Sequence, residues 1–310
     1  MSSNKSVTYH VRHDTTYEYV DVVSMSHNLA HLEARTCARQ TRRTGSLRIE
    51  PTPAVAVARQ DYFGNPVTAF TIQEPHRSLS VRAENVVDVH PEPVPEPAGT
   101  PAWEAAWTLL REGRDADTLD AYQYAFDSPY VRVDDELAEY AAPSFPPGRP
   151  ILEAALDLTK RIHTDFRYDP TATTTATPLK QVLELRRGVC QDFAHLEIGC
   201  LRSLGLAARY VSGYLLTTPP PGRPRLIGAD ASHAWVSVYC PGFGWVDLDP
   251  TNNQIPGEQH ILLAWGRDYD DVSPVNGVVL GGGKHFVAVA VDVVKAEDAA
   301  PAQFQSQSQS

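Results

Sequence analysis

Cysteine is scarce in this chain, and the few cysteines lie far apart. The 310 residues contain four cysteines, and no two of them form a C-x-x-C pair. So few, widely spaced cysteines exclude a disulfide framework, and the missing C-x-x-C pair argues against a structural zinc site. We therefore expect a reduced protein in which each cysteine is either a buried core residue or a reactive thiol.

Long apolar runs and concentrated basic charge are also missing. No segment is long and apolar enough to span a bilayer, and residues 1–19 lack the apolar stretch of a signal peptide. The net charge is −11, and the segment from Arg35 to Arg43 is the one basic cluster. Binding of nucleic-acid phosphates needs a concentrated basic surface. These absences predict a cytoplasmic protein with no membrane and no nucleic-acid partner.

The first ninety residues have the pattern of an antiparallel β domain. Val7, Tyr9 and Val11 alternate with polar residues, and no helical pattern interrupts the region. A period of two places one face of a strand on a core and the other in water. Residues 61–66, Asp-Tyr-Phe-Gly-Asn-Pro, have the composition of a tight turn between strands. We predict that residues 1–90 form an antiparallel β-sandwich-like domain.

A proline-rich stretch separates this region from the rest of the chain. Residues 91–102 contain five prolines, which oppose both helix and central strand, so we expect an extended linker. Beyond it, apolar stripes of helical spacing, such as Ile151 to Phe166, precede strand patterns such as Phe286 to Val294. We predict an α+β core over residues 103–295, C-terminal strands included, and a disordered Gln- and Ser-rich tail over residues 296–310.

The motif Gly188-Val189-Cys190-Gln191-Asp192-Phe193-Ala194 places a cysteine at the start of a helix. Apolar residues recur at three- and four-residue steps from Phe193 to Leu204, and Gly205 ends the helix. Unpaired backbone N–H groups and the positive end of the helix dipole favour a thiolate, the nucleophilic form of cysteine. A free cysteine on its own is most often a small buried hydrophobe. Cys190 therefore needs a base and an orienting group to be a candidate nucleophile.

Two downstream segments supply such groups. His233 begins an alternating strand pattern, and Asp249 ends a second strand after the turn at residues 241–244. Antiparallel neighbours joined by a short turn can bring the His233 and Asp249 side chains together. Asp247 would lie on the same face of a regular strand. We prefer Asp249, because Pro250 ends the strand and leaves the Asp249 side chain at the sheet edge.

With these motifs in this order, the chain resembles the bacterial transglutaminase-like superfamily. The resemblance covers about residues 150–270, and residues 7–90 resemble the β-rich region that often precedes this core. It implies a core similar to papain-like cysteine proteases, in which a helix carrying the nucleophile packs against an antiparallel sheet. The segments that carry it are Gly-Val-Cys-Gln-Asp-Phe-Ala around Cys190, Arg209 to Tyr214, His233-Ala234-Trp235, and Gly244-Trp245 through Asn252.

By this resemblance, Cys190 maps onto the nucleophile of the family, His233 onto its base and Asp249 onto its orienting acid. Animal members also carry calcium sites. We find no counterpart of these sites in the sequence, so neither a metal nor a cofactor is expected. The backbone N–H of Cys190 is the expected first oxyanion donor, and a tyrosine such as Tyr168, or a glutamine, is a candidate second donor.

The expected function is hydrolysis of a peptide or amide bond through a thioester, with a peptide or protein substrate. Transfer to an amine, as in a transglutaminase, or deamidation is the alternative within the same chemistry. Water is far more concentrated than any amine, and no sequence feature indicates a site that excludes water, so hydrolysis is favoured. A non-catalytic binding module on the same scaffold ranks last, since all three residues are present. The oligomeric state stays open.

Other histidines have simpler interpretations. His195 lies five positions after Cys190, well round the helix, and is interpreted as a packing or hydrogen-bonding residue. His27 and His31 have the spacing of a metal site on a helix, but their setting is β or loop, so a metal role is disfavoured.

Overall fold

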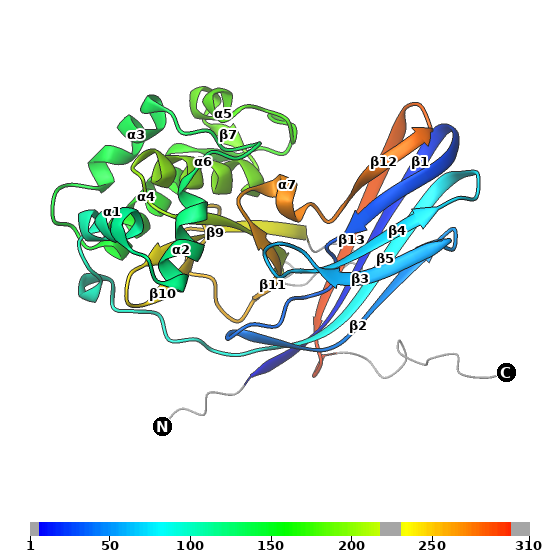
Figure 1. The fold of residues 1–310 in the computed structure, drawn as a ribbon, viewed down its shortest axis with the longest axis horizontal. Coiled ribbons are helices and arrows are strands. Elements are labelled where there is room, and N and C mark those ends of the chain that lie inside the picture. The colour runs from blue at the N-terminus through cyan, green and yellow to red at the C-terminus, as the bar shows by residue number, and fades with distance from the viewer. Residues whose placement is uncertain (1–5, 218–230, 299–310) are drawn as a thin grey trace, which may run out of the picture.

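The computed structural model describes residues 6–217 and 231–298. A curled antiparallel sheet stands beside a second body of helices around a smaller sheet (Figure 1). Most of the tail expected over residues 296–310 lies outside the described residues. Within these two ranges, no helix combines the length and the apolar character needed to cross a membrane.

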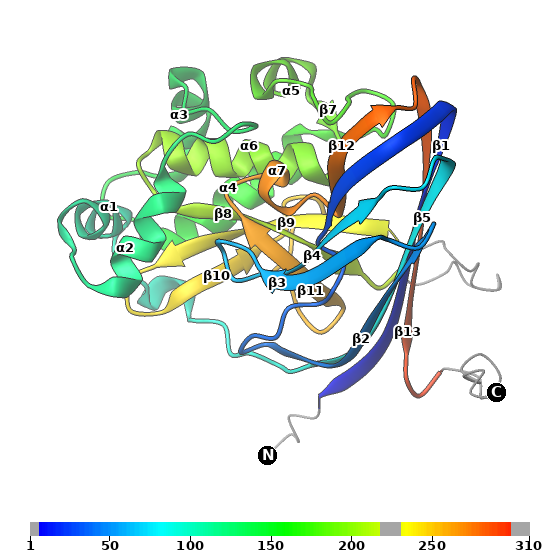
Figure 2. The same ribbon diagram turned by 45° about the vertical axis from the view of Figure 1, so that its right-hand side comes forward.

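The first body is built from four long lines of strand. Across it, β2 and β3 form one line, β5 and β4 the next, β1 the third, and β13 and β12 the last (Figure 2). The single strand β1 is 24 residues long and pairs with β5 and β13 over its first half and with β4 and β12 over its second. The bounds are β1 Val7–Ala30, β2 Gln40–Glu50, β3 Val55–Gln60, β4 Pro66–Ile72, β5 His76–Val89, β12 Val275–Gly281 and β13 His285–Lys295.

The sheet bends at the level where, in three of these lines, one strand ends and the next begins. The register of β1 against β5 shifts between Glu18 and Val23, and the neighbouring Gly281, Gly282 and Gly283 all have positive φ. Both halves of the bent sheet contribute to one apolar core, so the N-terminal domain is sandwich-like although it is one curled sheet. Its buried members are Tyr19, Val23, Ala30, Leu32, Phe70, Ile72, Leu79, Val81 and Ala83.

The two C-terminal strands belong to this curled sheet. The sequence analysis assigns these two strands to the core of residues 103–295, and this assignment is wrong. β12 pairs with the second half of β1, and β13 pairs with residues Tyr9 to Tyr19 of β1. The alternating valines of β13 identify a strand with one apolar face, but such a pattern fits many partners. Pairing between the two ends of a chain is decided by tertiary packing.

The second body contains the helices and a four-stranded antiparallel sheet. Residues 91–96, within the expected linker, form no helix or strand and lead into it. The sheet order is β10-β9-β8-β11, and a short parallel pair, β6 and β7, lies apart from it. The bounds are α1 Trp103–Glu112, α2 Ala116–Tyr122, α3 Asp135–Ala141, α4 Ile151–Asp165, β6 Arg167–Tyr168, α5 Leu179–Leu185, β7 Arg187–Gly188, α6 Cys190–Ser203, β8 Ala208–Leu215, β9 Ala231–Cys240, β10 Gly244–Leu248, β11 His260–Gly266 and α7 Tyr269–Val272, with short 3₁₀ turns at Pro97–Gly99, Gln123–Ala125 and Ala142–Ser144.

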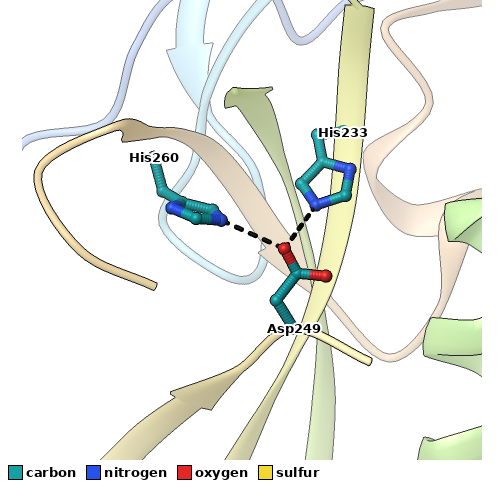
Figure 3. Close-up of side chains that lie close together, drawn as sticks. All are labelled: His233, Asp249 and His260. Carbon is teal, nitrogen blue, oxygen red and sulfur yellow. Dashed lines mark hydrogen bonds and ion pairs between the residues drawn. The ribbon is translucent and has the colours of Figure 1, made fainter. Parts of the chain in front are cut away.

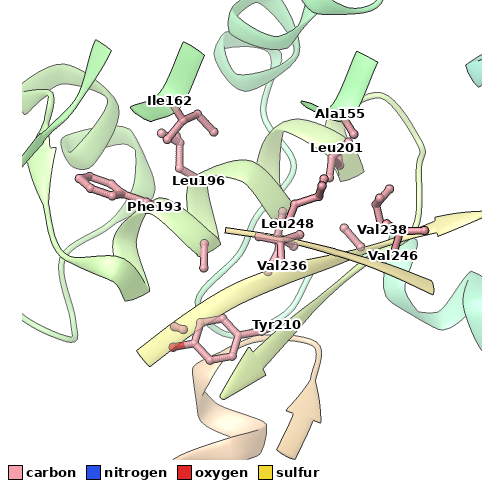
Figure 4. Packing of buried hydrophobic residues seen from close by; sticks show 14 of the residues in the cluster. Ala155, Ile162, Phe193, Leu196, Leu201, Tyr210, Val236, Val238, Val246 and Leu248 are labelled. Atoms are coloured by element: carbon pink, nitrogen blue, oxygen red, sulfur yellow. The ribbon is translucent and has the colours of Figure 1, made fainter. Parts of the chain in front are cut away.

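Helix α6 is packed against the sheet by the apolar stripe that the sequence predicts. Phe193 and Leu196 of α6 and Val236 of β9 are buried in one cluster (Figure 4). Full burial of such a side chain contributes roughly 1.5–3 kcal/mol. This packing fixes the rotation of α6, so that Cys190 at its first position opens into the same cleft as His233 of β9.

The turn expected at residues 61–66 ends at Asn65, because Pro66 begins β4, and it joins the two bodies. Asn65 Nδ2 donates to the Trp265 carbonyl at 2.8 Å, and Asn65 Oδ1 accepts from the Trp265 N–H at 3.0 Å and from Arg35 at 2.9 Å. The Arg35 guanidinium also lies 3.6 Å from the Trp265 ring centroid. Gly64 has a φ of 73°, which glycine adopts without strain. The curled sheet is thus attached to β11 of the second body.

Candidate active site

Cys190 is the first residue of α6, and a buried carboxylate holds the turn before it. Asp192 Oδ2 accepts from the Val189 N–H at 2.8 Å and from the Thr173 hydroxyl at 2.7 Å. Gly188 packs directly against Asp192: a Cβ at Gly188 would lie 2.5 Å from Asp192 Oδ2. The glycine before the cysteine is therefore required by the close approach of this side chain. The Cys190 side chain is partly buried and remains accessible from the cleft.

His233 and Asp249 meet through their side chains, although they are not opposite each other in the hairpin. Leu248 is paired with Val236, and the strand then ends in a turn at Asp249. His233 Nε2 lies 2.8 Å from Asp249 Oδ2 (Figure 3). The structure thus brings together the His and Asp that the sequence analysis selects, and it does so by breaking the strand at Asp249.

The surroundings of Asp249 favour its ionised form. The side chain is fully buried, and Oδ1 accepts from the backbone N–H groups of Thr251 at 3.0 Å and Asn252 at 3.2 Å. Asn252 Nδ2 also donates to Oδ2 at 2.7 Å. Burial alone would raise the pKa of Asp249, but the hydrogen bond to His233 and the other donors outweigh it, so the pKa lies well below its usual range.

The same contacts favour the charged form of His233. Burial lowers its pKa, but the hydrogen bonds and charges of Asp249 and Cys190 outweigh burial and raise the pKa of His233 to about 9. Because Nε2 is hydrogen-bonded to Asp249, Nδ1 is the ring nitrogen that is available to the Cys190 sulfur. The imidazole is therefore held between an anion and a thiol.

Cys190 and His233 line a cleft between the two bodies of the protein, and Asp249 is buried behind His233. The cleft has a volume of about 270 Å³. The second body supplies Cys190, Gln191, Tyr210 and His233, and the curled sheet supplies the opposite wall. We name this wall the N-terminal wall; it consists of His13, Thr15 and Tyr17 of β1 with Val287 and Val289 of β13.

Two family models match the chain in the order of its two bodies. The bacterial transglutaminase-like N-terminal region matches residues 9–88, and the transglutaminase-like superfamily model matches residues 139–250. This chain belongs to the transglutaminase-like superfamily. The second match contains Cys190, His233 and Asp249.

Relatives of nearly full length occur in mycobacteria. The chain is 44% identical to an uncharacterised protein of Mycobacterium tuberculosis, over 93% of each sequence. It is 34% identical to an uncharacterised protein of Mycobacterium leprae, over 92% of this chain and 98% of that protein. A 99-residue stretch is 31% identical to the protein-glutamine gamma-glutamyltransferase of Pseudomonas aeruginosa, and it spans 29% of this chain and 15% of that enzyme.

Among solved structures, the fold is similar to that of a protein from Cytophaga hutchinsonii that is described as a candidate cysteine protease. The TM-score is 0.75 at 21% sequence identity, and the match covers 94% of this chain and 91% of that one. At this identity the comparison shows a shared fold. The similarity extends over the curled sheet and the transglutaminase-like core together.

A second histidine, which the sequence analysis does not select, contacts the same carboxylate. His260 Nε2 lies 3.2 Å from Asp249 Oδ2, and its side chain is buried at the start of β11. Burial is the largest cause that lowers the pKa of His260, so this ring is neutral. The only sequence signal for it is a histidine directly before the apolar run of residues 261–265.

Asp247 has different partners from Asp249. Its Oδ2 accepts from Arg39 Nη1 at 2.8 Å and from Trp235 Nε1 at 3.0 Å. Arg39, which lies in the turn before β2, also donates to the His260 carbonyl at 3.2 Å. Asp247 therefore anchors the β9–β10 hairpin to the N-terminal domain, whereas Asp249 contacts His233.

The other residues that the sequence analysis discusses lie outside the hydrogen bonds that join His233, Asp249 and His260. His195 is buried, accepts from the Tyr269 N–H at 3.1 Å and stacks on Tyr130, in keeping with a packing and hydrogen-bonding residue. Tyr168 is 54% exposed and does not line the cleft, although burial and, secondly, the Cys190 charge raise its pKa. His31 contacts the Ser273 carbonyl.

His233, Asp249 and His260 also have the residue types of a metal site. Their ligand atoms all lie within 4.8 Å of one another. Both histidines, however, direct Nε2 at the same carboxylate oxygen, as hydrogen-bond donors do. A metal ion would need to replace these hydrogen bonds, so we interpret the group as a hydrogen-bonded His–Asp–His arrangement.

Proposed function

We propose that this chain is a cysteine-dependent hydrolase of peptide or amide bonds, with Cys190 as nucleophile, His233 as base and Asp249 as orienting acid. The observation that carries the proposal is the 2.8 Å hydrogen bond between His233 Nε2 and Asp249 Oδ2, in a cleft that also contains Cys190. This bond fixes the tautomer of the ring and leaves Nδ1 for the sulfur.

The acylation step uses the charge distribution of this group. The Cys190 thiolate attacks the carbonyl carbon of the substrate, and the backbone N–H of Cys190 is one donor for the resulting oxyanion. As the tetrahedral intermediate collapses, the C–N bond breaks and the His233 imidazolium gives its proton to the leaving amine or ammonia. The raised pKa of His233, about 9, supports a protonated ring at neutral pH.

The deacylation step returns the enzyme to its starting state. His233 removes a proton from water, which attacks the thioester carbonyl. The C–S bond then breaks, the substrate leaves as a carboxylic acid, and the Cys190 thiolate and the His233 imidazolium form again. Asp249 stabilises the imidazolium throughout and does not exchange a proton, which agrees with its strongly lowered pKa.

Amine transfer onto a glutamine side chain, or deamidation of it, is the second candidate. Both share the acylation step, with the glutamine side-chain amide as the group attacked. An amine resolves the thioester in transfer, and water resolves it in deamidation. The similarity to the Pseudomonas aeruginosa protein-glutamine gamma-glutamyltransferase over 99 residues favours keeping this candidate. A binding module without catalysis is the remaining alternative, and it requires that the Cys190 thiol have no enhanced reactivity.

The deciding experiment is mass spectrometry of a mixed peptide pool after incubation with the protein, with and without a primary amine. New peptide termini support the hydrolase, whereas amine adducts or deamidation at glutamine support the second candidate. Cys190→Ser and His233→Ala should each lower turnover about 10³-fold or more. Cys37→Ser is the matched control, because Cys37 is also partly buried but lies in the N-terminal region. Retained turnover in Cys190→Ser contradicts the proposal.

A further inference from the structure

The N-terminal wall faces the nucleophile with one side of the curled sheet. In the register of β1 and β13, Tyr17 is opposite Val287 and Thr15 is opposite Val289. Opposite residues of antiparallel strands lie on the same face of a sheet. These residues and Cys190 line one cleft, so a substrate bound at the sulfur occupies a space that the N-terminal wall also borders.

This wall carries no formal charge. Its titratable histidine, His13, has a pKa lowered to about 4 by burial, and its ring nitrogens contact the Tyr214 hydroxyl at 2.9 Å and the Thr15 hydroxyl at 2.8 Å. The other members are hydroxyl-bearing or aliphatic. Of all described residues that line the cleft, none is Asp, Glu, Lys or Arg.

The apolar face of β13 is left open at the cleft. Val291 and Val293 on this face are 1% and 0% exposed, because they pack in the main core. Val287 and Val289, further along the same face, are 50% and 54% exposed. The row of apolar side chains on this face of β13 therefore continues from the core into the cleft, where a bound molecule can cover Val287 and Val289.

β13 also offers backbone groups beside the two valines. Within the described residues, this strand pairs only with β1, so the edge of its segment His285 to Ala290 that points away from β1 has no partner strand there. An extended polypeptide can add to such an edge through main-chain hydrogen bonds, while pockets select its alternate side chains. A small molecule has no comparable backbone to pair.

We propose that the N-terminal wall is the acyl-donor subsite and that it selects an extended polypeptide segment with uncharged, apolar side chains around the attacked carbonyl. This inference rests on the proposed function of Cys190 and adds the class of substrate. A charged side chain placed against Val287 and Val289 loses water and gains no partner, so it is disfavoured. We expect an apolar segment to bind at least 10-fold more tightly than an acidic or a basic one.

Binding is measured first, and separately from turnover. Dye-labelled decapeptides with one central glutamine, flanked by Leu and Val, by Glu or by Lys, are titrated against Cys190→Ala by fluorescence polarisation. We expect the Leu/Val peptide to bind at least 10-fold more tightly than the other two. Adding Val289→Glu should weaken binding of the Leu/Val peptide at least 10-fold. It should also raise the affinity for the Lys peptide relative to the affinity for the Leu/Val peptide.

The matched control is Ala288→Glu, which adds the same charge one residue away on the opposite face of β13 and leaves the cleft unchanged. Equal affinity of Cys190→Ala for the three peptides would overturn the inference. So would an equal change of these affinities in Val289→Glu and Ala288→Glu. A wild-type protein that binds with the expected preference but turns over no peptide overturns the proposed function instead. The melting temperatures of both glutamate variants should stay within about 3 °C of that of Cys190→Ala, which shows that the fold is intact.

Discussion

His233 and His260 hydrogen-bond to the same oxygen of Asp249, at 2.8 and 3.2 Å (Figure 3). A carboxylate only accepts, so both rings donate through Nε2. The pKa of His233 is raised to about 9, and the pKa of His260 is lowered, chiefly by burial. One buried carboxylate thus holds a charged ring and a neutral ring.

His260→Phe tests whether the neutral ring positions Asp249. Phenylalanine keeps an aromatic ring beside Trp235, whose centroid lies 5.4 Å away, and it removes the hydrogen bond to Asp249. We expect kcat/KM to fall about 10-fold, in line with the loss of an orienting hydrogen bond. The alkaline limb of the Cys190 alkylation profile should move to higher pH, because Asp249 then interacts more strongly with His233.

The control for this prediction is His27→Phe, since His27 is exposed and contacts Thr71 in the curled sheet. A loss of activity in His260→Phe without any shift of the pH profile would indicate general loosening of the fold. The same loss in His27→Phe would show that the assay reports stability.

The His233–Asp249 pair predicts a loss of stability at alkaline pH. The folded pKa of His233, about 9, lies above its ordinary value of 6.5. Its contribution to the free energy of unfolding is therefore complete below pH 6.5 and is lost as the pH rises through 9. The shift corresponds to about 3 kcal/mol.

Urea unfolding of the wild type and His233→Gln at pH 6, 8 and 10 measures this contribution. The free-energy difference between the two proteins should be largest at pH 6 and smallest at pH 10. A difference that stays constant over this range would contradict a raised pKa for His233 in the folded protein.

Gly188→Ala should lower both the stability of the protein and the reactivity of Cys190. An added Cβ would lie 2.5 Å from Asp192 Oδ2 and 2.8 Å from Asp192 Cβ, so the turn before Cys190 has to shift. We expect a loss of about 1–3 kcal/mol in the free energy of unfolding and a lower rate of Cys190 alkylation. Gly257→Ala is the matched control, because a Cβ there meets nothing within 4 Å. Equal stability of the two variants would refute the packing argument.

Glu197 predicts a second dependence of stability on pH. The side chain is fully buried on α6 and accepts from the Thr159 hydroxyl at 2.7 Å. Burial, together with the charge of Asp249, raises the pKa of Glu197 to about 8 from 4.5. The folded protein therefore binds an extra proton between pH 4.5 and 8, and the stability contributed by this group falls as the pH rises through that range.

Glu197→Gln cannot ionise and should lack this dependence. We expect its Tm, relative to wild type, to be higher at pH 8 than at pH 5 by a few degrees. Differential scanning calorimetry at the two pH values measures the change. A relative Tm that is the same at both would mean that Glu197 is ionised in the folded protein.

The sequence alone determined the local elements and the identities of the central residues. The glycine turn and the apolar stripe predict α6 with Cys190 at its start, and the turn composition predicts the Asp61–Asn65 loop. The alternating hairpin, ended by a proline, predicts the contact of His233 with Asp249. These features depend on residues that are close in sequence, where propensity and period are informative.

Only the tertiary structure decided what surrounds those residues. His260 reaches Asp249, Arg39 anchors Asp247, and β13 pairs with β1 to bring Val287 and Val289 to the cleft. Each contact joins segments that are distant in the chain, and a histidine, an arginine or an alternating strand fits many partners equally well in the sequence. The partner is selected when the two bodies pack together and bury their apolar faces. The free energy of this burial depends on the whole buried surface and not on the local sequence pattern.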